Sequence, residues 1–97
     1  MPTLHQEWYI IVNPHAGSGK TMCQWIPAEN HLKELGVPFY TVYTTHKHHA
    51  TELAATAARL GYRKIMAVGG DGSLHEVFSG IMQWCDEHHA DPSSFRL

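Results

Sequence analysis

A carboxylate set among glycines is the feature of this sequence that most directly suggests chemistry. The segment runs Gly69-Gly70-Asp71-Gly72-Ser73. Glycines let the backbone approach a ligand closely and adopt positive φ, yet each costs roughly 0.5–1 kcal/mol relative to alanine within a regular element. Three in five positions therefore indicate a geometric demand. Asp71 could coordinate Mg²⁺, accept a proton from an attacking hydroxyl, or simply bond its own backbone in a turn, and Ser73 could cap a helix or bind phosphate.

A second glycine-bearing segment lies earlier, from Asn13 to Thr21 (NPHAGSGKT). It joins an apolar run to a helical pattern, where free backbone N–H groups and the helix dipole favour an anion such as phosphate. The P-loop pattern GxxxxGK[ST] would require glycine where this chain has Pro14, whose ring removes an N–H donor and fixes φ. The segment is therefore a candidate phosphate-binding loop of another kind, with an ordinary strand-to-helix turn as the alternative.

These two loops need elements to position them, and short apolar runs alternate with helical periodicity along the chain. Residue types predict strands at 8–12, 39–43 and 64–68. Spacing predicts helices at 20–35, 50–60 and 74–82. Pro27 lies inside the first helix and predicts a kink or a restart there. The apolar residues expected to form the inner faces of these helices are Met22, Trp25, Ile26, Leu32, Leu35, Leu53, Ala54, Ala57, Leu60, Leu74, Val77, Phe78, Ile81 and Met82.

The alternation of strands and helices predicts the fold class. Right-handed βαβ units give a three-layer α/β domain with a mainly parallel sheet, which binds ligands beyond the carboxyl ends of its strands. Both glycine-bearing loops fall at those ends. A length of 97 residues with 43% hydrophobic and 16% charged content suits one domain with one core.

Charge and cysteine content exclude several classes. The formal net charge of -2 and the scattered Lys and Arg give no basic field, so nucleic acid is not an expected partner. Cys23 and Cys85 are far apart, which predicts neither a disulfide framework nor a zinc site and fits a reducing cytoplasm. No basic leader and no apolar run of roughly 20 residues is present in the sequence, so we expect neither export nor a membrane span.

Histidines and tryptophans also invite functional interpretations. His46, His48 and His49 cluster before the second predicted helix, but structural metal sites usually add Cys or carboxylates from other elements, so we expect a solvated loop. The three tryptophans fall within apolar patterns and are expected in the core.

The motifs taken in order resemble the diacylglycerol kinase catalytic-domain family. They are Asn13-Pro14-x-x-Gly17-x-Gly19, then Thr44 followed by Ala50, then Gly69-Gly-Asp-Gly-Ser-x-His-Glu-Val-x-x-Gly80. The resemblance extends from about Tyr9 to Ile81. It implies a nucleotide-binding domain similar to that of NAD kinases and phosphofructokinases, followed in the family by a β-rich domain that receives the lipid.

The resemblance also implies the cofactors and the site. ATP and Mg²⁺ would be bound, and the reaction would be phosphoryl transfer, in which the protein positions the nucleophile and neutralises phosphate charge. Asp71 would be the catalytic residue, through Mg²⁺ or as the base. Thr44 would lie near the adenosine, and Glu76 would tether either the glycine-bearing loop before its helix or the nucleotide. The residues implied at the nucleotide are Asn13, Pro14, His15, Ala16, Gly17, Thr44, Gly69, Gly70, Asp71, Gly72, Ser73 and Glu76.

The resemblance also suggests which lipid is the acceptor and how the full-length protein is organised. His75 stands where bacterial diacylglycerol kinases usually carry Asn, whereas sphingosine kinases resemble this chain, which favours a sphingoid base over diacylglycerol. Residues 1–97 would be the N-terminal ATP-binding part of a truncated catalytic domain, inactive without the lipid-binding part and prone to self-association. The full-length protein would be cytoplasmic, with peripheral contact to the inner membrane face. Two alternatives stay open: a non-catalytic nucleotide-binding or interaction module, and an NAD kinase-like domain.

Overall fold

Strands and helices alternate along the chain as expected. The structure, a computed structural model, describes residues 5–91 and 95. The elements within these residues are β1 (His5–Val12), the 3₁₀ turn η1 (Ala16–Gly19), α1 (Lys20–Glu34), β2 (Phe39–Tyr43), α2 (His49–Arg59), β3 (Tyr62–Val68) and α3 (Asp71–His88). The predicted fold class, an α/β domain with a parallel sheet, is confirmed.

The sheet has the order β2-β1-β3, and both pairings are parallel. Its central strand, β1, is buried on both faces: Tyr9 and Ile11 belong to one core cluster, and Ile10 and Val12 to the other. A strand covered on both sides needs apolar residues at every position, which explains why residues 8–12 of this strand are an unbroken apolar run.

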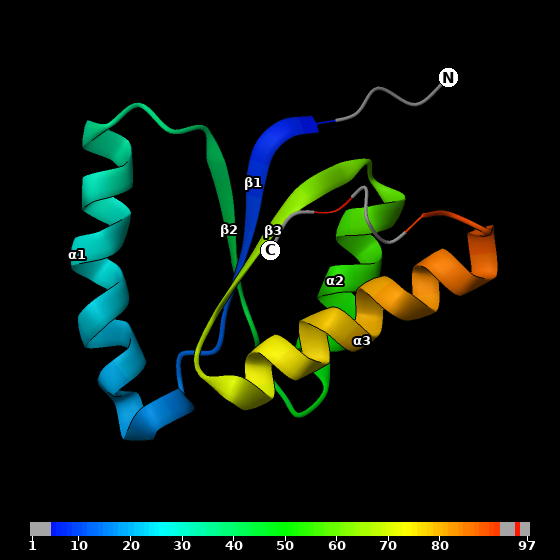
Figure 1. Cartoon of the computed structure of the whole chain (residues 1–97). Coiled ribbons are helices and arrows are strands. Elements are labelled where there is room, and N and C mark those ends of the chain that lie inside the picture. Colours follow the sequence, from blue (N-terminus) through cyan, green and yellow to red (C-terminus); the bar gives the residue numbers. More distant parts are fainter. Residues whose placement is uncertain (1–4, 92–94, 96–97) are drawn as a thin grey trace.

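Helices cover both faces of the sheet and make three layers (Figure 1). The helices α2 and α3 pack on the face of Tyr9 and Ile11, and α1 lies over the opposite face, where Trp25 is only 3% exposed. Trp8 and Trp84 are half-buried and pack against the two clusters. All three tryptophans therefore contribute to the core, as expected.

The predicted inner faces of the helices are wrong at five positions. The exposed residues are Ile26, Leu35, Leu60, Leu74 and Phe78. Leu35 and Leu60 are the C-caps of α1 and α2, so they lie past the last turn that packs on the sheet. Leu74 and Phe78 lie four residues apart on a face of α3 different from that of buried Val77 and Ile81. Helical spacing alone did not distinguish these two neighbouring faces.

Helix boundaries also differ from the expectation. The helix α1 runs through Pro27 without restarting. Proline lacks the N–H that would have donated to the carbonyl of Cys23. Both residues are exposed, so water can donate a hydrogen bond to that carbonyl instead. The helix α3 begins earlier than predicted, at Asp71, and ends later, at His88. None of the helices in the described ranges is long and apolar enough to cross a membrane.

Candidate functional site

The carboxyl ends of the three strands meet at one edge of the sheet. The Asn13 N–H donates to the carbonyl of Val68 at 2.9 Å, and the Thr44 N–H donates to the carbonyl of Val12 at 2.9 Å. The ladder register therefore places Asn13 between Thr44 and Gly69, the residues that follow the two outer strands. The two glycine-bearing loops and the end of β2 thus converge as the sequence predicted (Figure 1).

Gly69 makes close packing possible at this edge. A Cβ at Gly69 would lie 2.5 Å from the Ser73 Oγ and 3.0 Å from the Asn13 Cβ, and its φ of 156° disfavours any other residue. Ser73 and Thr44 are both buried here, at 5% and 7% exposure. The missing side chain therefore lets Asn13 and the first turn of α3 approach each other.

The loop after β1 is a tight turn held by Asn13. Its side-chain Oδ1 accepts the His15 N–H at 3.1 Å, and its carbonyl accepts the Ala16 N–H at 3.3 Å. Gly17 and Gly19 have φ of 63° and 90°, a region that disfavours side chains. Asn13, Pro14, His15 and Ala16, which the resemblance places at the nucleotide, therefore lie in one turn.

Both helices that leave this edge have a glycine as the N-cap residue. Gly19 is the N-cap of α1 and Gly70 the N-cap of α3. A glycine has no side-chain oxygen with which to cap the first-turn N–H groups, and such N–H groups at a helix N-terminus attract anions. The start of α1 follows the loop that Asn13 begins, and the start of α3 follows Gly69, so backbone donors of both loops could meet an oligophosphate at this edge.

Glu76 on α3 binds the loop between β2 and α2. Its Oε1 accepts the His48 N–H at 3.2 Å and lies 3.4 Å from the His48 Nδ1. The Thr51 hydroxyl donates to the Glu76 carbonyl at 2.9 Å. This tether reaches the loop before α2, whereas the resemblance implied a tether to the glycine-bearing loop before α3 or to the nucleotide.

Two grooves border Glu76. The smaller has a volume of about 290 Å³, near the lower limit for small-ligand sites, and is lined by Asn13, His15, Thr44, Thr45, His46, Lys47 and Glu76. The larger, of about 670 Å³, is lined by His48, Thr51, Glu52, Gly72, His75, Glu76, Ser79 and Gln83. The smaller groove joins the ends of β1 and β2.

Five of the residues predicted at the nucleotide line one or both grooves. Asn13, His15, Thr44 and Glu76 line the smaller groove, whereas Gly72 lines the larger one. The other predicted residues lie in the two glycine-bearing loops, with Asp71 as the first residue of α3. The sequence did not predict that Thr45, His46 and Lys47 line this groove, although a run of polar residues directly after a predicted strand end was the available signal.

Known proteins match most of the chain. Residues 7–93 match the family described as diacylglycerol kinase catalytic domain. A Bacillus subtilis protein whose name proposes a lipid kinase is 31% identical over 76% of this chain and 25% of its own length. Human sphingosine kinase 2 is 34% identical over 84% of this chain and 12% of its own, and mouse sphingosine kinase 1 is 36% identical over 76% and 20%. The chain thus spans a quarter or less of these relatives, and it belongs to the diacylglycerol kinase catalytic-domain family.

Proposed function

We propose that this domain binds ATP at the carboxyl edge of its sheet and serves a lipid kinase. The reaction would transfer the γ-phosphate to a hydroxyl of diacylglycerol or of a sphingoid lipid. One observation carries the proposal: Thr44, Asn13 and Gly69 lie side by side where all three strands end, next to a groove. In open α/β sheets this edge is where ligands bind.

The two glycine-bearing loops would hold the phosphates. Backbone N–H groups at the starts of α1 and α3 are suited to the triphosphate, because each helix has a glycine N-cap and carries the positive end of its dipole there. Thr44 and the smaller groove would receive the adenosine. Phosphoryl transfer needs mainly this positioning and charge neutralisation.

Asp71 would supply the carboxylate chemistry at the start of α3. A carboxylate oxygen beside bound phosphates suits Mg²⁺, which protein sites often hold through one or two carboxylates together with substrate phosphates. The metal would neutralise charge on the phosphates. The alternative role for Asp71 is the base that takes the proton of the lipid hydroxyl.

The acceptor and its pocket would come from a longer protein. The relatives are at least about four times as long as the matched segment, so residues 1–97 would form the ATP-binding part, with no lipid kinase activity alone. Two of these relatives are named sphingosine kinases, and His75 precedes Glu76 in this chain, which favours a sphingoid base. The family match favours a lipid kinase over the NAD kinase-like alternative. Contact with the cytoplasmic face of a membrane would bring the protein to its acceptor.

Calorimetric titration of the chain with ATP, with and without Mg²⁺, tests the proposal. We expect saturable binding that GTP does not reproduce and that Gly69→Ala weakens by about tenfold or more, because the new Cβ separates Asn13 from Ser73. Asp71→Asn distinguishes the two roles: a metal ligand lowers affinity only when Mg²⁺ is present, and a base leaves affinity unchanged.

Asp86→Asn is the matched control for Asp71→Asn, because Asp86 is an exposed carboxylate on the same helix. It should leave ATP binding unchanged. Circular dichroism establishes that each variant is folded. A folded wild-type chain that shows no saturable ATP binding would contradict the proposal that these loops form the nucleotide site.

A further inference from the structure

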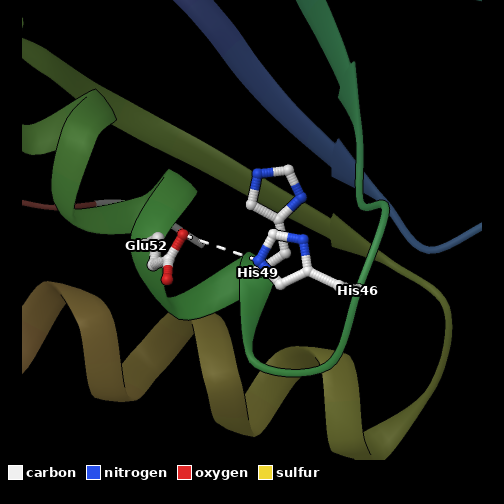
Figure 2. Close-up of side chains that lie close together, drawn as sticks. All are labelled: His46, His49 and Glu52. Carbon is white, nitrogen blue, oxygen red and sulfur yellow. Dashed lines mark ion pairs between the residues drawn. The ribbon is translucent and has the colours of Figure 1, made fainter.

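Three potential metal ligands converge where α2 begins. Figure 2 shows His46 from the preceding loop beside His49 and Glu52 from the first turns of α2. One ring nitrogen of each histidine and one carboxylate oxygen all lie within 4.8 Å of one another. The His46 Nε2 is 3.7 Å from the Glu52 Oε2, and the two imidazole rings stack with centroids 4.3 Å apart. Glu52 supplies a carboxylate that the sequence did not place beside these histidines.

We propose that His46, His49 and Glu52 bind a late first-row divalent ion such as Zn²⁺ or Ni²⁺, with water completing the coordination. Imidazole nitrogens suit these ions, whereas Mg²⁺ prefers oxygen ligands, so the site is separate from any Mg²⁺ on a nucleotide. Bonds of about 2.0–2.2 Å require the donors to draw closer together than they are here. The side chains of His46 and Glu52 are 56% and 69% exposed and therefore free to rotate inward.

His46 already has an oxygen partner at its other ring nitrogen. Its Nδ1 is 3.0 Å from the Thr45 hydroxyl oxygen. A histidine that donates its Nδ1–H to an oxygen presents the lone pair of Nε2, and here Nε2 is the nitrogen beside Glu52. Metal-bound histidines commonly have such an oxygen partner at the other nitrogen.

His49 gives the proposal a specific consequence. Its Nδ1 accepts the Thr45 N–H at 3.0 Å. An ion bound at Nδ1 displaces this hydrogen bond, and an ion bound at Nε2 leaves the ring proton on Nδ1, which then cannot accept. The Thr45 N–H loses its acceptor in both cases. Thr45 lines the smaller groove beside Asn13, so ion binding rearranges one wall of that groove.

Neighbouring residues supply the controls. His48 follows in the same loop but its Nδ1 lies 3.4 Å from Glu76 on α3, so it is engaged away from the proposed ion. His31 and Glu34 on α1 have the same spacing as His49 and Glu52 and lie 4.0 Å apart, yet they join no group of three such donors in the described part of the chain. They test whether an exposed His/Glu pair is sufficient.

Titration of the 97-residue chain with ZnCl₂, NiCl₂ or MgCl₂ tests the site. The background is Cys23→Ser, because the exposed Cys23 thiol would compete for soft ions. We expect one Zn²⁺ per chain, with affinity lowered about tenfold or more by His46→Ala or Glu52→Gln and unchanged by His31→Ala. Mg²⁺ should not displace the Zn²⁺.

Amide NMR gives a second readout. The Thr45 amide should shift and exchange faster with solvent when Zn²⁺ binds, and the His31 amide should not. His46 and Glu52 are exposed, so their variants remain folded and keep the test valid even if His49→Ala unfolds the chain. The proposal is overturned if Zn²⁺ does not bind, if binding survives in both His46→Ala and Glu52→Gln, or if the Thr45 amide does not respond.

Discussion

Glu76 holds the backbone of His48, although the two residues are 28 positions apart: the Glu76 Oε1 accepts the His48 N–H at 3.2 Å. His48 is the N-cap of α2 and has a φ of 65°, a conformation that costs energy for a residue other than glycine. The Glu76 carbonyl accepts the Thr51 hydroxyl one turn further along α2. One residue of α3 therefore fixes both the start of α2 and the loop that lines the smaller groove.

Glu76→Ala should destabilise the domain by about 1–2 kcal/mol, because the His48 N–H and the strained loop lose a charged acceptor. Glu76→Gln keeps an acceptor oxygen and should lose less. Urea unfolding measures the free energy of unfolding, and amide hydrogen exchange at His48 reports the loop directly. Glu34→Ala is the control, because its partner His31 is 4.0 Å away and both side chains are exposed. If the His48 amide exchanges at the same rate in Glu76→Ala as in the wild type, Glu76 does not hold this loop.

Local residue types were enough to predict where the three strands end and the edge where the loops meet, although β1 and β3 begin earlier than predicted, at His5 and Tyr62. The strand β2 spans Phe39–Tyr43 as expected, because aromatic and β-branched residues favour a strand regardless of what lies beside it. Alternating strands and helices then force a parallel sheet, which brings the segments after β1, β2 and β3 to one edge.

Contacts between distant residues could not be predicted in the same way. Nothing in the spacing of Glu76 and His48 indicates that one bonds the backbone of the other. The exposure of Leu35 follows from where α1 ends on the sheet, which is a tertiary property. Glu52 likewise joins His46 only because the loop folds back over the first turn of α2.

Gly80 shows how a motif residue can serve packing. A Cβ at this position of α3 would overlap the Thr51 carbonyl oxygen of α2 and lie 3.0 Å from the Ala54 Cβ. Gly80→Ala should therefore push the two helices apart and destabilise the domain by about 1–3 kcal/mol.

Gly72→Ala is the matched control for Gly80→Ala. Gly72 is in the same helix, but a Cβ there would meet nothing within 4 Å. Since alanine favours a helix by up to about 1 kcal/mol over glycine, this variant should be neutral or slightly stabilising. Urea unfolding of both variants decides the matter. Equal loss of stability in the two would show that the α2–α3 contact is not the cause.

Alkaline pH should weaken the fold through Tyr9. Burial in the core raises the pKa of Tyr9, and the neighbouring Tyr40 and Tyr62 add to the effect. The unfolded chain then releases this proton before the folded chain does, so the stabilising contribution is complete below about pH 10 and is lost as the pH rises above it. The free energy of unfolding should fall in that range.

Tyr9→Phe should make that fall less steep, because phenylalanine has no proton to release. Tyr43→Phe is the control, because Tyr43 is an exposed residue of β2. Urea unfolding at about pH 8 and about pH 10.5 compares the variants on either side of the usual tyrosine range. If Tyr9→Phe leaves the fall in the free energy of unfolding unchanged, the loss of stability at alkaline pH must come from other groups, such as Tyr62.

The two thiols should differ sharply in reactivity. Cys85 is 2% exposed in the core, and its burial raises the pKa of the thiol, with Arg63 acting in the opposite direction. Cys23 is exposed on α1. Because the thiolate is the reactive form and the reagent needs access, a disulfide reagent should modify one thiol rapidly in the folded chain and the second only on unfolding. Cys23→Ser should abolish the fast phase of modification, whereas Cys85→Ala should retain it. If both thiols of the native chain react equally fast, the core around Cys85 opens to the reagent.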